Sequence, residues 1–296
     1  MDLSTVIAGV PFPFGVMNAS GALGVTRQEL EALGGSHAGA IVTKSMTPLA
    51  REGNPEPRYV AIDGGSINSM GLPNLGYPAY VKLIPELKRF GKPVLASLAG
   101  LHPDDFLEGA KALETARPDL LEVNLSCPNI PGKPQIGYDF EETERLLTEI
   151  RALVTVPFGV KLPPYFEPIH HQKIAEVLQR SGVAFVTVIN SVGNTLVVDP
   201  EREMVVIKPK GGFGGLGGRM IKPVALANVR AFWKIWGDRI PIIGTGGVQH
   251  GVDIVKISAT SVPGPFTDIP GLETAHSHFC GGWTFGKDSK RNGLAE

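Results

Sequence analysis

Apolar runs rich in β-branched residues alternate along the chain with amphipathic segments of helical period. The predicted strands are apolar throughout, which is typical of parallel strands covered on both faces. They are residues 14–19, 40–45, 94–99, 120–126, 158–162, 184–190 and 241–244. The helical period predicts helices between them at residues 27–33, 77–90, 105–116, 141–154, 172–180 and 223–236.

This alternation of strands and helices, without a break in composition, indicates an α/β fold of the (β/α)₈ TIM barrel type over residues 1–253. Residues 51–75 and 195–210 interrupt the rhythm and are predicted to add small strand insertions at the carboxyl-terminal face of the barrel. Residues 254–296 show no amphipathic helical pattern, and only 257–262 could form a strand. The sequence therefore leaves the eighth βα unit undecided.

The charge balance limits the classes of partner. Lys and Arg total 28 and Asp and Glu total 29, which gives a net charge of −1 with no basic tract. Nucleic acid and membrane surfaces are therefore not expected as partners. No apolar run reaches the roughly 18–20 residues of a membrane span. Two cysteines suit a reducing compartment, so a cytoplasmic location is predicted.

Polar residues end the apolar runs, at the face of a barrel where active sites lie. The set comprises Asn18, Ser20, Lys44, Ser45, Asn124, Lys161, Asn190 and Ser191. Polar residues end many strands for structural reasons alone, but a buried lysine is costly without a partner. The two lysines therefore favour a binding or catalytic role for the set.

Two glycine tracts, residues 211–218 and 244–247, fall late in the chain. Glycines let backbone N–H groups approach a phosphate closely, and the loops after the last strands of a barrel often bind one. The alternative is a flexible loop without a ligand.

Cys127 leaves a predicted strand and enters a loop rich in proline and glycine, where a reactive thiol is expected. The structural alternative is a small buried apolar residue. The pattern His276-x-His278-x-Cys280 matches no standard zinc spacing, so no metal site is predicted.

Several short motifs occur in order along residues 1–253. They read NSMGLPN at 68–74, NLSCPN at 124–129, Val160-Lys161, Asn190-Ser191 and the two glycine tracts. In combination they resemble the dihydroorotate dehydrogenase family. The loop NIPGKPQ at 129–135 and the cysteine at 127 resemble the lid and base of its soluble class 1A enzymes. Class 2 enzymes, which are membrane-bound, have serine as the base.

The resemblance implies an FMN cofactor, oxidation of dihydroorotate to orotate in pyrimidine biosynthesis, and Cys127 as the catalytic base. The residues implied to contact FMN are Ser20, Lys44, Ser45, Asn124, Lys161, Ile189, Gly218, Gly246 and Gly247. The residues implied to contact the substrate are Lys44, Asn68, Met70, Gly71, Leu72, Asn124, Asn129, Asn190 and Ser191.

The resemblance also implies fumarate as the electron acceptor, reduced to succinate at the same site, and a homodimer. Two alternatives stay open. The chain could be another FMN-dependent barrel reductase acting on a different pyrimidine. Residues 254–296 lack the glycine–threonine turn that the family has after its last strand. This atypical C-terminal segment also allows an inactive product that binds flavin or misfolds.

Overall fold

The computed structural model describes residues 4–21, 23–126 and 135–260. At its centre lies a curled parallel sheet with the strand order β14-β9-β8-β7-β6-β3. Its strands are β3 (Ile41–Val42), β6 (Val94–Leu98), β7 (Leu120–Asn124), β8 (Phe158–Leu162), β9 (Val186–Val188) and β14 (Ile242–Gly244). The sequence predicted each of them, β8 with these same bounds.

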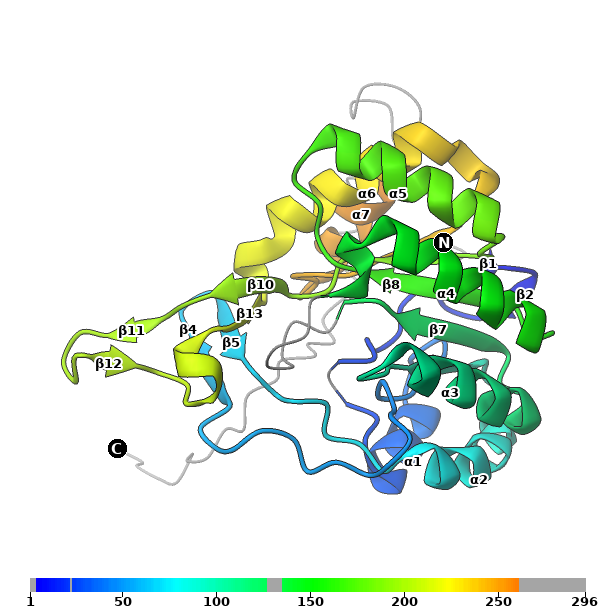
Figure 1. The fold of residues 1–296 in the computed structure, drawn as a ribbon, viewed down its shortest axis with the longest axis horizontal. Coiled ribbons are helices and arrows are strands. Elements are labelled where there is room, and N and C mark those ends of the chain that lie inside the picture. Colours follow the sequence, from blue (N-terminus) through cyan, green and yellow to red (C-terminus); the bar gives the residue numbers. More distant parts are fainter. Residues whose placement is uncertain (1–3, 22, 127–134, 261–296) are drawn as a thin grey trace, which may run out of the picture.

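Helices connect the strands and cover the outer side of the sheet (Figure 1). They are α1 (Arg27–Gly35), α2 (Tyr77–Leu87), α3 (Pro103–Ala116), α4 (Phe140–Leu153), α5 (Pro168–Ser181), α6 (Lys222–Trp236) and α7 (Gly251–Thr260). Short 3₁₀ turns are η1 (Lys88–Phe90), η2 (Ile136–Tyr138), η3 (Pro209–Gly212), η4 (Arg219–Ile221) and η5 (Gly237–Arg239). None of the helices within the described ranges is long and apolar enough to cross a membrane.

Helix α4 shows how the sequence produces this layer. Asp139 is its N-cap and accepts a hydrogen bond from the backbone N–H of Glu142, which satisfies one of the free donors of the first turn. Leu146, Leu147 and Ile150 form an apolar stripe that is buried against the sheet.

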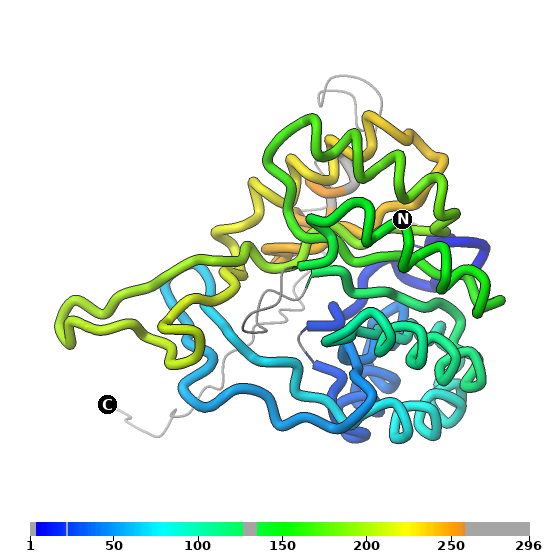
Figure 2. Tube along the Cα trace, in the orientation of Figure 1, coloured from blue at the N-terminus to red at the C-terminus, as the bar shows by residue number. Residues whose placement is uncertain are grey.

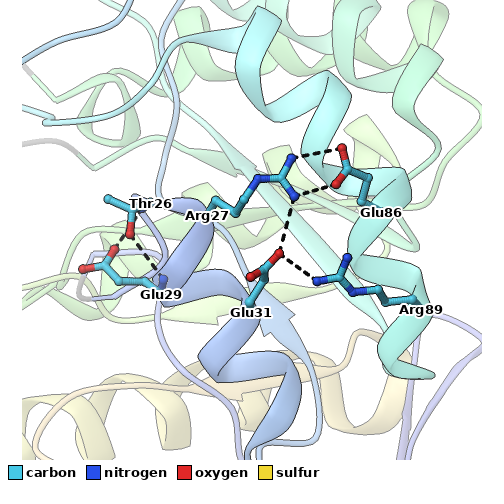
Figure 3. Close-up of polar contacts among 6 residues, drawn as sticks. All are labelled: Thr26, Arg27, Glu29, Glu31, Glu86 and Arg89. Carbon is cyan, nitrogen blue, oxygen red and sulfur yellow. Dashed lines mark hydrogen bonds and ion pairs between the residues drawn. The ribbon is translucent and has the colours of Figure 1, made fainter.

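Ion pairs on the outer surface connect α1 to α2 and to η1 (Figure 3). Arg27 bonds both carboxylate oxygens of Glu86, and Arg89 bonds Glu31 at 2.7 Å. A capping box between Thr26 and Glu29 begins α1. Solvent reaches these side chains and screens their charges, so each pair contributes little to stability.

An N-terminal hairpin covers the amino-terminal ends of the parallel strands. It is formed by β1 (Thr5–Ile7) and β2 (Val10–Phe12). Ile7 and Phe12 are buried in a cluster with Leu95, Leu120 and Phe185, which lie where β6, β7 and β9 begin. One end of the sheet is thereby closed by apolar side chains, and polar groups are left to the carboxyl-terminal end.

The predicted insertions are confirmed as strands. An antiparallel sheet of order β10-β13-β5-β4 contains β4 (Tyr59–Ile62), β5 (Gly65–Asn68), β10 (Val192–Thr195) and β13 (Gly214–Gly217). The hairpin of β11 (Val198–Asp199) and β12 (Met204–Val205) forms the tip of an arm that projects from the body (Figure 2).

The prediction of a strand at residues 14–19 is wrong. This segment contains a bend and no strand, and the side chain of Asn18 takes the place of backbone pairing with β3. Its amide donates to Val42 O at 2.7 Å and accepts from Val42 N at 3.0 Å, the pair of bonds that a neighbouring backbone would make. The segment thus lies beside β3 without regular pairing.

The C-terminal expectation also needs correction. Residues 251–260 form α7, so the suggestion of a strand from 257 is wrong within the described residues, and this stretch does form a helix. The segment from 261 to 296 lies outside the described residues. Closure of an eight-stranded barrel and a boundary at residue 253 therefore stay predictions.

Candidate active site

Buried polar side chains gather at the carboxyl-terminal ends of the parallel strands. Lys44 and Ser45 follow β3, Asn124 ends β7, Lys161 lies in β8 and Asn190 follows β9. Parallel strands end at the same edge of a sheet, so these residues converge, as the sequence predicted. We call these five residues the strand-end cluster.

Hydrogen bonds connect the uncharged members of the cluster. Asn124 Nδ2 donates to Ser45 Oγ at 3.0 Å, and Asn190 Nδ2 lies 3.5 Å from Asn124 Oδ1. Asn190 also donates to the carbonyl of Ser126, whose backbone N–H donates to Asn124 Oδ1. The loops after β3, β7 and β9 are therefore held in one arrangement.

Both lysines of the cluster are almost completely buried. Lys44 is 5% exposed, and its Nζ donates to the carbonyl of Gly21 at 2.8 Å. Lys161 is 4% exposed, and its Nζ donates to Ser20 Oγ at 3.2 Å. Buried ammonium groups attract anionic ligands strongly because solvent does not screen them. The two lysines suit a site for an anion or an electron-rich ring.

The structure adds Glu122, a residue that the sequence analysis did not select. It lies in the middle of β7, is 2% exposed, and accepts hydrogen bonds from Ser20, Ser97 and Thr187. The available signal was a charged residue inside an otherwise apolar strand, since such a residue is costly without partners.

Asn68 and Ser191 meet at β13, far from each other in the sequence. Asn68 Nδ2 donates to the carbonyl of Gly215 at 3.0 Å. A Cβ at Gly215 would overlap Ser191 Oγ, so a glycine is needed for this close approach. The backbone N–H of Ser191 donates to Asn190 Oδ1 at 2.8 Å, which connects the pair to the strand-end cluster.

Residues 70–72 lie in a loop that two asparagines hold in place. Asn54 N donates to the carbonyl of Met70 at 2.8 Å, and Leu72 has a positive φ of 57°. Asn74 Oδ1 accepts from the backbone N–H of Thr47 at 3.1 Å, which attaches the loop to the segment after β3. The predicted substrate motif is therefore attached to Thr47, which closely follows Lys44 and Ser45 in the chain.

The two glycine tracts meet in front of α6. A Cβ at Gly247 would lie 2.9 Å from the carbonyl O of Gly218 and 2.8 Å from Lys222 Cβ, in the first turn of α6. A Cβ at Gly246 would lie 3.6 Å from Ile189 Cγ1. All three glycines have a positive φ, which L side chains rarely adopt. Backbone N–H groups beside a helix N-terminus are donors suited to a phosphate.

An ion pair between α6 and α7 stabilises the region where the two glycine tracts meet. Lys222 Nζ donates to Asp253 Oδ1 at 2.6 Å and joins α6 to α7. Burial by itself raises the pKa of Asp253, but hydrogen bonds from Lys222 and from the backbone N–H groups of Gln249 and His250 outweigh it and hold the pKa below its ordinary value.

Cys127 and Asn129 lie outside the described residues, so their predicted roles are untested. The flanking residues are described, and Ser126 Oγ donates to Gln135 Oε1 at 3.0 Å. Across the described ranges, no group of three or more His, Cys, Asp or Glu side chains is arranged to hold a metal ion.

Comparisons with known proteins agree with this geometry. The family model described as dihydroorotate dehydrogenase matches residues 2–260. The protein named dihydroorotate dehydrogenase A (fumarate) from Lactococcus lactis subsp. cremoris is 49% identical over 255 residues, which cover 85% of this chain and 82% of the relative. The protein of the same name from Lactococcus lactis subsp. lactis shows the same identity and coverage.

A solved structure supports the fold alone. The crystal structure described as DHODH in complex with ferulenol, from Eimeria tenella, has a TM-score of 0.72 at 21% identity and covers 88% of this chain and 76% of that chain. The family model covers most of the sequence, and relatives are identical at about half of the aligned positions. This chain belongs to the dihydroorotate dehydrogenase family, in the class 1A group to which those relatives' names refer.

Proposed function

We propose that this chain oxidises dihydroorotate to orotate in pyrimidine biosynthesis, with FMN as cofactor and fumarate as the electron acceptor. The observation that carries the proposal is the strand-end cluster, which gathers two buried lysines and two amides. Beside it lies a cradle formed by Gly218, Gly246 and Gly247. Membership of the family supports the choice of substrate. The names of the Lactococcus relatives support fumarate as the acceptor.

The donor set fits FMN. The cradle of Gly218, Gly246 and Gly247 would hold the phosphate through backbone N–H groups at the start of α6. Ser20, Ser45 and Asn124 would bond the flavin ring, and Ile189 would pack against it. When bound, FMN supplies a two-electron acceptor for the hydride that leaves C6 of the substrate.

The remaining groups would bind the substrate and move its proton. Lys44 would offset the charge of the substrate carboxylate, because a buried ammonium next to a carboxylate forms a strong charge-assisted bond. The side chains of Asn68, Asn124, Asn129 and Asn190 can both donate to and accept from the amide groups of the substrate, with Ser191 beside them. Met70, Gly71 and Leu72 would border the substrate through the backbone of their loop.

Cys127 would take the proton from C5. A free thiol with a pKa of about 8.5 is mostly protonated at neutral pH, so the rate of flavin reduction should rise with pH as the thiolate forms. Lys161 would stabilise negative charge on the ring as the substrate is oxidised.

The visible spectrum of the purified chain tests the proposal. Bound FMN that is bleached by dihydroorotate without oxygen, and restored by fumarate, is the expected result. Bound FMN that dihydroorotate does not bleach would indicate a reductase with another substrate. A chain without flavin would contradict the proposal. Restoration by a quinone but not by fumarate would move the chain to another class.

We also propose that the chain forms a homodimer, which the apolar surface of the arm around β11 and β12 supports. Its exposed apolar side chains are Leu196, Val198, Met204 and Phe213. Exposed apolar side chains gathered on a projecting element are typical of a surface that binds another chain. Sedimentation of the purified chain should give twice the monomer mass, and Val198→Glu should shift it toward the monomer. A cytoplasmic location stays a prediction that rests on the cysteine content.

A further inference from the structure

Glu122 is a buried charged residue that the proposed reaction does not use. Hydroxyl groups from three parts of the chain converge on its carboxylate. Ser20 Oγ and Ser97 Oγ donate to Oε1 at 2.7 Å and 2.9 Å, and Thr187 Oγ1 donates to Oε2 at 2.7 Å. An apolar residue would fill this position at lower cost, since a buried charge needs such partners.

The carboxylate determines the direction of the hydrogen bonds that lead to Lys161. A serine hydroxyl has one proton to donate, and an ionised carboxylate can only accept. The proton of Ser20 therefore points to Glu122, and a lone pair of Ser20 Oγ faces Lys161 Nζ at 3.2 Å. The order of donation is Lys161, then Ser20, then Glu122.

A second series of bonds leads from the same carboxylate oxygen to Asn124. Because the proton of Ser97 points to Glu122, Ser45 must be the donor across the 2.9 Å contact between Ser45 Oγ and Ser97 Oγ. Ser45 Oγ then accepts from Asn124 Nδ2 at 3.0 Å. This fixes which side of the Asn124 amide is the donor, and its Oδ1 is left to accept from Ser126 N and Asn190.

We propose that Glu122 is a positioning residue whose carboxylate, by ending both series of hydrogen bonds, orients Lys161 toward the flavin and the Asn124 amide toward the substrate. The inference rests on the proposed function, which assigns those two ligands. The negative charge of the Glu122 carboxylate also offsets part of the positive charge that Lys161 presents to the flavin ring.

Three variants separate this role from a structural one. Glu122→Gln keeps the shape and removes the charge. Ser97→Ala interrupts only the series that leads to Asn124. Thr187→Val is the matched control, because it removes a buried hydroxyl from the same carboxylate but on Oε2, outside both series.

The experiment uses flavin-loaded protein and three measurements. They are the midpoint potential of the flavin, the dissociation constant of orotate from the flavin absorbance, and the melting temperature. Glu122→Gln should make the potential more positive, because Lys161 then stabilises the reduced, anionic ring more strongly. Ser97→Ala should keep the wild-type potential and weaken orotate binding about tenfold, the equivalent of one hydrogen bond.

Thr187→Val should lower only the melting temperature. If all three variants lower the melting temperature while potential and orotate affinity stay at wild-type values, Glu122 is structural and the inference is overturned. If Glu122→Gln does not fold, equal orotate affinity for Ser97→Ala and Thr187→Val overturns it in the same way. A wild-type chain that binds no flavin would overturn the proposed function as well, so the two failures are distinguishable.

Discussion

Replacement of Gly218 by alanine tests the proposed phosphate cradle. Gly218 has φ 86° and ψ −162°, a conformation that is essentially restricted to glycine and that costs other residues about 1–3 kcal/mol. An added Cβ would lie 2.5 Å from Gly65 Cα, so β5 would also have to move. We expect Gly218→Ala to lower the free energy of unfolding by about 2–4 kcal/mol. Because the turn itself must shift, the FMN dissociation constant should rise at least about tenfold.

The neighbouring Gly217 provides the control. A Cβ there would meet only Ser66 Oγ at 3.5 Å, an ordinary contact. Urea denaturation gives the free energy of unfolding, and the quenching of FMN fluorescence gives the dissociation constant. Equal FMN affinity for Gly217→Ala and Gly218→Ala would refute the assignment of Gly218 to the cradle. Equal stability would refute the argument from backbone conformation.

Three further predictions concern single side chains. Asp253→Asn should lower the free energy of unfolding by about 3 kcal/mol at pH 7, because Lys222 loses its buried partner. The pKa of Asp253 is lowered in the folded state, so this contribution is present above about pH 4 and is lost as the pH falls through the folded pKa. A difference between the urea curves of the two proteins that does not shrink below that pH would contradict this. Asn18→Ala should lower the free energy of unfolding, measured by thermal or urea denaturation, by about 1–3 kcal/mol, since both backbone groups of Val42 lose their partner. An unchanged denaturation curve would mean that water replaces the amide. Cys127→Ser should keep FMN but slow its reduction by dihydroorotate at least about 100-fold, because a hydroxyl is a far weaker base; stopped-flow traces at the wild-type rate would exclude the thiol as the base.

The alternation of apolar runs and helical periods was sufficient to locate the strands of the parallel sheet and the helices α1 to α6. The strands β3, β6, β7, β8 and β9 are buried along their whole length, so their sequences are mostly apolar, and this signal is local. Asp139 and the apolar stripe of α4 are local signals in the same sense. The motifs that carry the family resemblance are also short continuous segments, which is why the family could be identified without a structure.

Contacts between distant segments could not be read from the sequence. Residues 14–19 have the composition of a strand, yet the Asn18 amide takes the place of the backbone ladder beside β3. Residues 254–296 were expected to lack a helix, but residues 251–260 form α7. Asp253 accepts from the backbone at the start of this helix and from Lys222 on α6.

Glu122 shows most clearly what the sequence could not determine. The sequence places a carboxylate inside an apolar strand, but its meaning depends on Ser20, Ser97 and Thr187, which lie as far as 102 positions away in the chain. Short-range patterning determined the elements, the family and the residues at the strand ends of this protein. Only the tertiary structure decided which hydroxyl meets which carboxylate, because a hydrogen bond is directional and depends on positions in space that no local pattern specifies.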